Sequence, residues 1–267
     1  YILAGGTGAW LIKTDARGNK VWDKTFGALY AKSVQQTTDG GYILAGYTWS
    51  FGLLEDAWLI KTDIDGNKIW DQTFSGSRGS DQDYAYSVQQ TSDGGYILAG
   101  EIESYGVAEN AWLIKTDIEG NKLWDQTFGG LDGDYAYSVQ QTSDGGYILA
   151  GGTKSYGAGK EDAWLIKTDA EGNKEWDQTF GGSDYDEIRS VQQTSDGGYI
   201  LAGYTMSYGA GGYGAWLIKT DAEGNKEWDQ TFGGSPYDKA YSVQQTSDGG
   251  YILAGTTWSG AGDYDAW

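Results

Sequence analysis

The chain has 267 residues, with 38 acidic side chains against 18 basic ones and a formal net charge of −20. This charge repels nucleic-acid phosphates and anionic membrane surfaces, so neither is an expected partner. The chain contains no cysteine and no histidine, which excludes disulfides, thiolate chemistry and the commonest general base. No stretch approaches the length of apolar sequence that a membrane-spanning helix needs, so no membrane insertion is expected.

One pentapeptide organises the whole sequence. The copies of Tyr-Ile-Leu-Ala-Gly begin at Tyr1, Tyr42, Tyr96, Tyr147, Tyr199 and Tyr251. The last four intervals are 54, 51, 52 and 52 residues long and carry nearly identical text. A period this regular indicates one supersecondary unit that is copied along the chain. The unbroken repeat therefore predicts a single domain over residues 1–267.

Each unit contains four short β patterns. In one copy these are the A strand (Ser190–Thr194), the B strand (Gly198–Gly203), the C strand (Ala215–Asp221) and the D strand (Glu227–Phe232). Ser-Asp-Gly-Gly joins A to B, and Asp-Ala-Glu-Gly-Asn joins C to D, with Gly224 at a left-handed position. No segment has a sustained helical period. Four antiparallel strands in each repeat predict an all-β fold, a β-propeller built from four-stranded antiparallel blades.

The number of blades depends on which strand is counted. Patterns A and D and the complete C pattern each occur five times, whereas pattern B occurs six times. Residues 11–267 divide into five units of about 51 residues, which favours a five-bladed ring with a seam formed by residues 242–267 and 1–26. Tyr1–Gly5 and Tyr251–Gly255 would then compete for one B position. The alternative is six blades whose incomplete first and last sheets expose edges that invite self-association.

An Asp, a Gly and a Trp recur at fixed spacing around each C–D turn, as in Asp221, Gly224 and Trp228. Here the text resembles the tryptophan-docking motif of quinoprotein-like (PQQ-type) β-propellers, in which the Trp packs against the next blade. The whole unit, DGGYILAG…DAWLIKTD..GN..W..TFGG, is also similar to repeats in secreted and cell-surface proteins of archaea and bacteria. The resemblance implies WD40-like or PQQ-like blades and an extracellular or cell-surface location. It implies no quinone, because the family's cofactor residues have no counterparts in this chain.

Tryptophan is expected to form the core between blades. An indole buries about 200 Å² and stacks well between sheets. The Asp and Gly of each turn are expected to be structural too, because Asp can cap its own hairpin and Gly tolerates the unusual backbone angles. The D-strand members of this structural core are Trp22, Trp70, Trp124, Trp176 and Trp228.

A set of carboxylates precedes the A strands. Asp83, Asp134, Asp186 and Asp238 each lie four residues before the Ser of an A strand, and Leu29 takes this place in the first copy. Because the A strand is the innermost strand of a propeller blade, these side chains would gather near one channel mouth. A hard cation such as Ca²⁺ is the one cofactor that this set suggests. The other interpretation is that each Asp caps the blade-to-blade turn through backbone N–H groups.

The copies differ most in the connection between the B and C strands. A ligand-binding site is therefore expected in these loops. Loops on a rigid scaffold commonly carry binding sites, and an exposed aromatic ring beside Asp, Asn and Ser suits a sugar. Five such loops on one rim would be multivalent. The other interpretation is that the rings pack over the hairpin and shield the blade edge. The candidate ligand-binding residues are Trp49, Phe51, Tyr105, Tyr156, Tyr208, Trp258 and Tyr264.

Three function classes follow. The favoured one is a noncatalytic extracellular or cell-surface scaffold or adhesion-type binding module, with a protein partner or self-association through blade edges. The alternative is a carbohydrate-binding, lectin-like propeller with a glycan partner. A glycosidase-type enzyme is least favoured, because catalysis needs unlike groups in one pocket and near-identical repeats supply the same group several times; no catalytic residue is assigned. The departures from the repeat consensus, which form no recognisable constellation, are Arg78, Glu101, Glu103, Lys154, Lys160, Arg189 and Pro236.

Overall fold

The computed structural model describes residues 1–6, 8–27, 29–50, 54–76, 82–104, 108–209, 211–258 and 264–266, without the side chains of residues 49, 50, 54, 104 and 264. The chain divides into two compact units, Tyr1–Phe128 and Gly129–Trp267. Regular structure in the described ranges is all β. Within them there is no helix with the length and apolar character that a membrane crossing requires.

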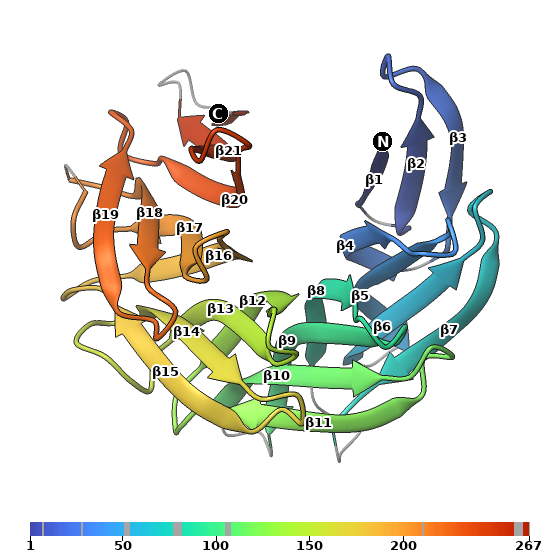
Figure 1. Cartoon of the computed structure of the whole chain (residues 1–267), viewed down its shortest axis with the longest axis horizontal. Coiled ribbons are helices and arrows are strands. Elements are labelled where there is room, and N and C mark those ends of the chain that lie inside the picture. The colour runs from blue at the N-terminus through green and yellow to red at the C-terminus, as the bar shows by residue number, and fades with distance from the viewer. Residues whose placement is uncertain are drawn as a thin grey trace. The chain divides into compact units, whose positions relative to one another are not determined.

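The first unit contains three antiparallel sheets, drawn from blue to green in Figure 1. Each sheet follows the order of the chain, so that successive strands are hydrogen-bonded neighbours. The sheets consist of β1 (Ile2–Gly5), β2 (Trp10–Thr14) and β3 (Lys20–Thr25); of β4 (Leu29–Gln36), β5 (Tyr42–Ser50), β6 (Leu54–Thr62) and β7 (Lys68–Phe74); and of β8 (Asp83–Gln90), β9 (Tyr96–Ser104), β10 (Ala108–Thr116) and β11 (Lys122–Phe128).

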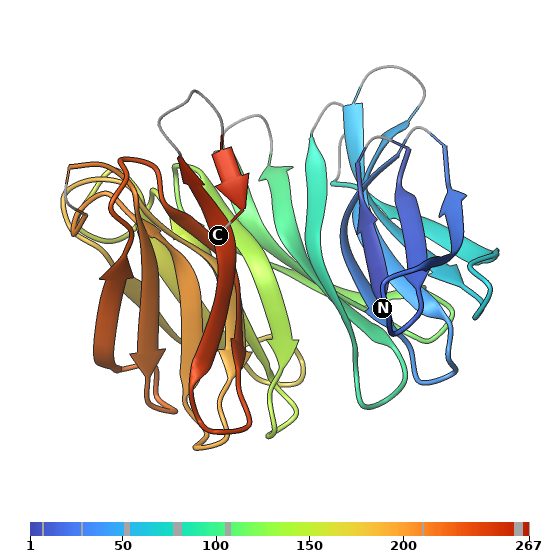
Figure 2. The same ribbon diagram turned by 90° about the horizontal axis from the view of Figure 1, so that it is seen from above.

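The second unit repeats this plan. Figure 2 shows β16 to β19 as one twisted sheet. The sheets consist of β12 (Asp134–Gln141), β13 (Tyr147–Thr153), β14 (Asp162–Thr168) and β15 (Lys174–Phe180); of β16 (Asp186–Gln193), β17 (Tyr199–Thr205), β18 (Gly214–Thr220) and β19 (Lys226–Phe232); and of β20 (Lys239–Gln245), β21 (Tyr251–Trp258) and β22 (Tyr264–Ala266).

The sheets confirm the predicted all-β fold with antiparallel blades of a β-propeller, but the preference for five blades is wrong. The described residues form six sheets, as in the six-bladed alternative, and the first and last have three strands each. Tyr1–Gly5 and Tyr251–Gly255 do not share one position, because β1 pairs with β2 and β21 pairs with β22. The reason is local: a short loop closes the β1–β2 hairpin at little entropic cost, whereas a seam must join strands more than 200 residues apart.

The apolar core lies along the B and C strands. Every residue of β13 and of β14 is buried, as expected for strands that have a neighbouring strand on each side and side chains packed on both faces. The C-strand indoles of Trp112, Trp164 and Trp216 are at most 1% exposed. Each donates its Nε1–H over 3.0 Å to an Asp of the adjacent D strand, so the one polar atom of the ring is paired inside the core.

Neighbouring sheets are joined by the D-strand tryptophans. The Trp70 ring lies against Gly120 in the C–D turn of the next sheet, and a Cβ built on that glycine would be 2.6 Å from the ring. The same ring meets the B-strand Tyr96 edge-on, with centroids 5.8 Å apart. Trp176 repeats the arrangement with Gly224 and Tyr199. Glycine is needed in this turn for two reasons, a positive φ and the close approach of the indole.

The A strands of neighbouring sheets are joined by side-chain acceptors. Ser138 Oγ accepts from the backbone N–H of Val191 at 3.2 Å, and Gln140 Oε1 accepts from the N–H of Gln193 at 2.6 Å. Equivalent bonds join β4 to β8 and β16 to β20. The recurrent Ser-Val-Gln-Gln text therefore supplies hydrogen-bond acceptors to the edge of the next sheet, whose N–H groups would otherwise lack a strand partner.

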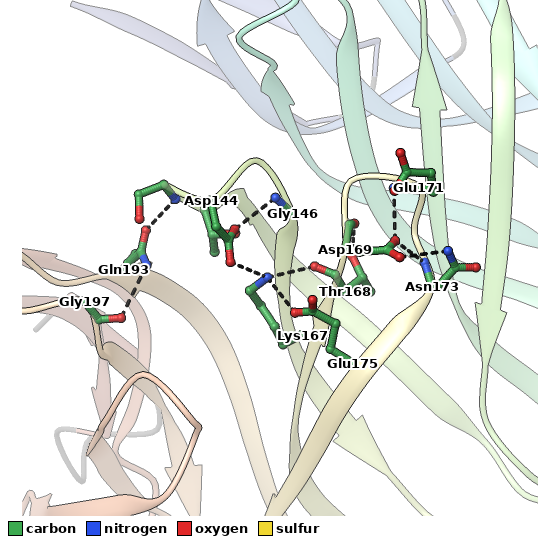
Figure 3. A network of polar contacts seen from close by, with 12 residues as sticks. Asp144, Gly146, Lys167, Thr168, Asp169, Glu171, Asn173, Glu175, Gln193 and Gly197 are labelled. Atoms are coloured by element: carbon green, nitrogen blue, oxygen red, sulfur yellow. Dashed lines mark hydrogen bonds and ion pairs between the residues drawn. The ribbon is translucent and has the colours of Figure 1, made fainter.

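A buried lysine of the C strand pairs with the A–B turn aspartate in each complete repeat, and Figure 3 shows that Lys167 also reaches the D strand. Its side chain is only 5% exposed. The ammonium donates to the carbonyl of Thr168 at 2.9 Å and forms ion pairs with Asp144 at 2.9 Å and Glu175 at 3.1 Å. Burial by itself would raise the pKa of Asp144, but hydrogen bonds from Thr142 and Lys167 outweigh it and hold that pKa at about 2.

The contact between a D-strand tryptophan and a turn glycine predicts that alanine substitution costs different amounts of stability at two glycines in equivalent turns. Gly18 and Gly120 both have φ of +82°, but a Cβ on Gly18 would meet nothing within 4 Å. Gly18→Ala should lose only about 1–2 kcal/mol of unfolding free energy through backbone strain. Gly120→Ala should lose a further ~1–3 kcal/mol, because the methyl group forces the Trp70 indole away. Denaturant unfolding of both variants measures the difference, and equal losses would contradict the docking role.

The ion pair between Lys167 and Asp144 predicts that the protein loses stability in acid. Because the pKa of Asp144 is held near 2, below its ordinary 3.8, its contribution to stability is complete above about pH 4 and is lost as the pH falls through about 2. Asp144→Asn should therefore lower the thermal midpoint at pH 7, and its difference from the parent protein should shrink towards pH 2. Circular dichroism melts between pH 2 and pH 7 measure this, with Asp65→Asn at an exposed turn as the control. A pH-independent difference would refute the assignment.

Candidate functional site

The repeats differ most at the end of each sheet where its A strand begins. In the second unit, the residue three positions before the A-strand Ser is Tyr135 in one copy, Glu187 in the next and Lys239 in the third. The paired B-strand residues differ as well, since Tyr135 lies opposite Gly152 and Glu187 opposite Tyr204. The surrounding Ser-Val-Gln-Gln and Tyr-Ile-Leu-Ala-Gly segments are unchanged. Unlike side chains are thus placed on a common scaffold, and we call this end of the second unit the variable rim.

Two cations of the variable rim lie over aromatic rings. The Arg189 guanidinium is 3.8 Å from the ring centroid of Tyr137 on the preceding sheet. The ammonium of Lys239 lies 4.0 Å from the ring centroid of Tyr204 and 4.1 Å from that of Tyr213. Burial lowers the pKa of Lys239. These cation–π contacts bridge successive sheets and hold the charged groups in fixed positions.

Two glutamates converge at the same end. A Cβ built on Gly152 would be 2.6 Å from Oε1 of Glu161 and 3.3 Å from Cγ of Glu187. Glu187 is 4% exposed and forms an ion pair with Arg189 at 2.8 Å. Burial, followed by repulsion from Glu187, raises the pKa of Glu161 to about 7, although Lys154 at 3.8 Å opposes this rise. Unlike ionisable groups therefore do meet here, which the near-identity of the repeats did not suggest.

In the first unit, tyrosine rings take the place of most of the charged groups at this end of the sheets. Tyr30 and Tyr47 stack with centroids 4.8 Å apart, and Tyr84 meets Tyr47 edge-on at 4.8 Å. The hydroxyl of Tyr84 donates to the Glu55 carboxylate. Burial, and then this hydrogen bond, raise the pKa of Tyr84. Lys32 lies 5.5 Å from the ring of Tyr47, so a cation again covers a tyrosine.

The predicted ligand-binding aromatics are only partly described. Phe51 and Tyr105 lie outside the described residues, and the side chains of Trp49 and Tyr264 do as well. Tyr156 packs on Trp164, and its hydroxyl donates to the carbonyl of Gly129 at 2.8 Å.

Two further candidates lie beside the variable rim. Tyr208 repeats the contact of Tyr156, packing on Trp216 and donating to the carbonyl of Gly181. Trp258 meets Tyr237 edge-on at 5.5 Å. Tyr156 and Tyr208 are nevertheless 45% and 48% exposed, so both residues remain partly accessible while they pack on the hairpin.

The carboxylates before the A strands close turns. Asp134 is fully buried and accepts from the N–H of Gly130 at 2.8 Å, from the hydroxyl of Ser155 at 2.7 Å and from the hydroxyl of Thr153. Asp83, Asp186 and Asp238 accept comparable bonds. Among the residues with described positions, no group of three or more acidic side chains is arranged to hold a metal ion. Calcium binding by this set stays a prediction.

The five D-strand tryptophans are all on the predicted strands. Trp22, Trp70 and Trp176 pack against the apolar core clusters, and Trp124 is partly buried. Trp228 is 37% exposed and contacts Tyr251 at 5.9 Å between ring centroids.

Sequence reasoning missed the variable rim. It noted Lys154, Lys160 and Arg189 as departures from the consensus but found no constellation, and Arg78 lies outside the described residues. A comparison of aligned copies could have found it. Glu187 and Arg189 stand at the two positions where the preceding copy has Tyr135 and Tyr137. Arg189 and Tyr137 come from different sheets, as do Lys239 and Tyr204, so spacing within a single repeat could not reveal these pairs.

Comparisons with known proteins bear on the fold. No protein-family model matches the chain, and no curated protein matches its sequence. The Dos1 propeller has a TM-score of 0.59 and 13% identity over 97% of this chain and 62% of its own. The Neurospora crassa Pan2 WD40 domain has a TM-score of 0.56 and 11% identity, covering 96% and 70%. A Bacteroides caccae protein of unknown function has a TM-score of 0.56 and 12% identity, covering 86% and 77%.

The likeness is one of fold. Identities of 11–13% show a shared β-propeller architecture and carry no ligand or activity across. The chain covers 62% of the Dos1 propeller, and the comparison relates strands and blades only. Any site must therefore be argued from this chain's own residues.

The raised pKa of Glu161 predicts a stability change near neutral pH. A carboxyl whose folded-state pKa lies near 7, above its ordinary 4.5, contributes stability that is complete below about pH 4.5 and is lost as the pH rises through about 7. Glu161→Gln removes this loss, so its thermal midpoint should rise relative to the parent protein between pH 5 and pH 8. Glu109→Gln, at the exposed equivalent position of the preceding repeat, is the control. Parallel pH profiles of Glu161→Gln and the parent would contradict the assignment.

Proposed function

We propose that the chain is a noncatalytic binding module that holds a protein partner on the variable rim of its second unit. The observation that carries the proposal is that unlike side chains gather at this rim of a fold whose repeats are otherwise nearly identical. The likeness to WD40 propellers supports a binding or scaffold role at the level of the fold. The partner-facing residues are those of the rim that remain exposed.

The exposed residues have the composition of a protein interface. Tyr185, Tyr237 and Tyr241 are 38%, 39% and 46% exposed, and Arg189 is half-buried. Tyrosine and arginine are enriched among residues that dominate binding energy, because a rigid ring or a planar guanidinium buries a large area at a small entropic loss. The Lys160 ammonium is 5.0 Å from the ring centroid of Tyr185 and 3.0 Å from Asp184, so this part of the rim is ordered before a partner arrives.

The glutamate pair supports binding over catalysis. A glycosidase would need two carboxyl groups that reach the same sugar. Glu187 is 4% exposed and its carboxylate is paired with Arg189, and the Glu161 side chain is 12% exposed. Neither group is open to a substrate in this arrangement, and the charge of Glu187 serves to fix Arg189 in the rim.

The net charge of the chain indicates which partners it favours, and its repeats indicate a cellular location. With a formal net charge of −20, the protein favours a partner that is neutral or basic overall. We place the protein outside the cell or on the cell surface, in an adhesion or scaffold role, because its repeats resemble those of secreted and cell-surface proteins. This location is part of the proposal.

A pair of matched variants tests the protein-binding proposal. The immobilised chain is used to capture partners from the extracellular fraction of its source, and crosslinks are mapped by mass spectrometry. Tyr237→Ala with Tyr241→Ala should weaken capture at least ~10-fold, because aromatic anchors dominate such interfaces. Ile69→Ala with Leu123→Ala, at exposed outer-strand positions of the first unit, should leave capture unchanged. Crosslinks outside the rim, or equal capture by both double variants, would refute the proposal.

A further inference from the structure

The B-to-C loops of two successive repeats are similar in sequence, but the residue that is Asp162 in the first is Gly214 in the second. The residue before the Ala-Trp of the C strand is Asp or Asn in most copies, and it is glycine only at Gly8, in the short first hairpin, and at Gly214. Asp162 occupies the position in β14 and is 2% exposed. Its Oδ2 accepts from the N–H groups of Ala158 and Gly159, both at 2.8 Å, so the carboxylate fills the space beneath the B-to-C loop.

Gly214 leaves that space open in the next copy. A Cβ built on Gly214 would find its nearest neighbours at 3.7 Å, so the position has room for a side chain. Around it lies a cavity of about 320 Å³ lined by Tyr208, Tyr213, Phe232, Ser235 and Asp238 among others. The hollow thus lies where the preceding repeat carries an aspartate. Its volume is at the small end of the ~300–1,000 Å³ that is usual for small-molecule sites.

The lining combines ring faces with hydrogen-bonding groups. Tyr208 is 48% exposed and Phe232 is 39% exposed, so flat apolar surfaces border the opening. Asp238 is 2% exposed and lies in the lining. Its carboxylate accepts from the Ser235 N–H at 2.9 Å and from the Ser235 hydroxyl at 2.7 Å. The Thr257 hydroxyl and the N–H of Gly234 donate to it as well, so the carboxylate is fully used in fixing this wall of the cavity, and the hydrogen-bonding groups left for a ligand are those of Thr231, Ser235 and Tyr213.

The charges around the cavity select against ionic ligands. The Lys239 ammonium already lies 4.1 Å from the ring centroid of Tyr213, so a second cation on this ring would be repelled. Hydrogen bonds from Thr257 and Ser235 outweigh the effect of burial and lower the pKa of Asp238, so its carboxylate is ionised and would repel an anion. A ligand that matches the lining is uncharged, has an apolar ring face and carries hydroxyl groups.

We propose that the cavity at Gly214 binds one uncharged sugar residue. The ring face of the sugar packs on Tyr208 or Phe232, and its hydroxyls bond to the polar groups of the lining, Thr231, Ser235 and Tyr213. Both contacts belong to this copy of the repeat, because Asp162 fills the corresponding space in the preceding copy. The cavity adjoins the exposed tyrosines proposed to hold a protein partner, since Tyr213 of its lining lies 6.0 Å from Tyr237 between ring centroids. The two proposals are nevertheless tested with different variants and different ligands, so either can fail while the other stands.

The test uses free glucose, galactose, mannose and N-acetylglucosamine with the full chain, by saturation-transfer NMR and calorimetry. At least one sugar should bind in a 1:1 ratio with a dissociation constant on the order of 1 mM. Gly214→Asp restores the residue found in other copies and should weaken binding at least ~10-fold with an unchanged thermal midpoint. Tyr208→Ala should also weaken binding, whereas Tyr156→Ala, its counterpart in the preceding copy, should not.

Several outcomes would overturn the proposal. They are the absence of binding by all four sugars, equal binding by the parent and Gly214→Asp, or saturable binding of free lysine or sulfate in place of a neutral sugar. If Gly214→Asp does not fold, the Tyr208→Ala and Tyr156→Ala pair decides, and equal affinities of these two variants would refute the site.

Discussion

The docking of an indole over a glycine is the contact on which the sheet-to-sheet packing depends. A four-stranded sheet cannot bury both of its faces alone, so its stability comes from neighbours. Trp70 spans this gap by placing its benzene ring against Gly120 and meeting Tyr96 edge-on, which joins the D strand of one sheet to the turn and the B strand of the next. The Ser and Gln acceptors of the A strands add directional bonds at the inner edge. Packing and hydrogen bonding together set the spacing of the sheets.

The buried lysines show how a charged residue is accommodated in such a packed arrangement. Lys115 is 4% exposed, yet its ammonium reaches the carbonyl of Thr116 and the carboxylate of Asp93 at the sheet surface. Because the charge is fully paired, the aliphatic stem can pack in the core while the polar end closes the A–B turn. A hydrophobic residue at this position would leave the negative charge of Asp93 without its ion-pair partner.

The strands could be predicted from the sequence because their signals are local. Alternating apolar residues, Gly-rich turns and the regular period of Tyr-Ile-Leu-Ala-Gly specify each hairpin without reference to any other repeat. The number of blades could not be predicted from the sequence. Tyr1–Gly5 and Tyr251–Gly255 have the same sequence, and only the strands with which they pair distinguish the five-bladed from the six-bladed arrangement. The variable rim was missed for a related reason, since Arg189 meets Tyr137 only after two repeats have packed together.

The near-identity of the sheet interfaces has a consequence for how the chain reaches its native state. Each repeat offers the same indole, the same glycine turn and the same A-strand acceptors to whichever sheet arrives next. A sheet can therefore dock on a non-consecutive copy with almost the native complement of contacts, leaving a loop of skipped repeats. Such near-degenerate arrangements are kinetic traps of repeat proteins. The few positions that differ between copies, such as Glu187 and Lys239, are then also the residues that discriminate correct from incorrect neighbours during assembly.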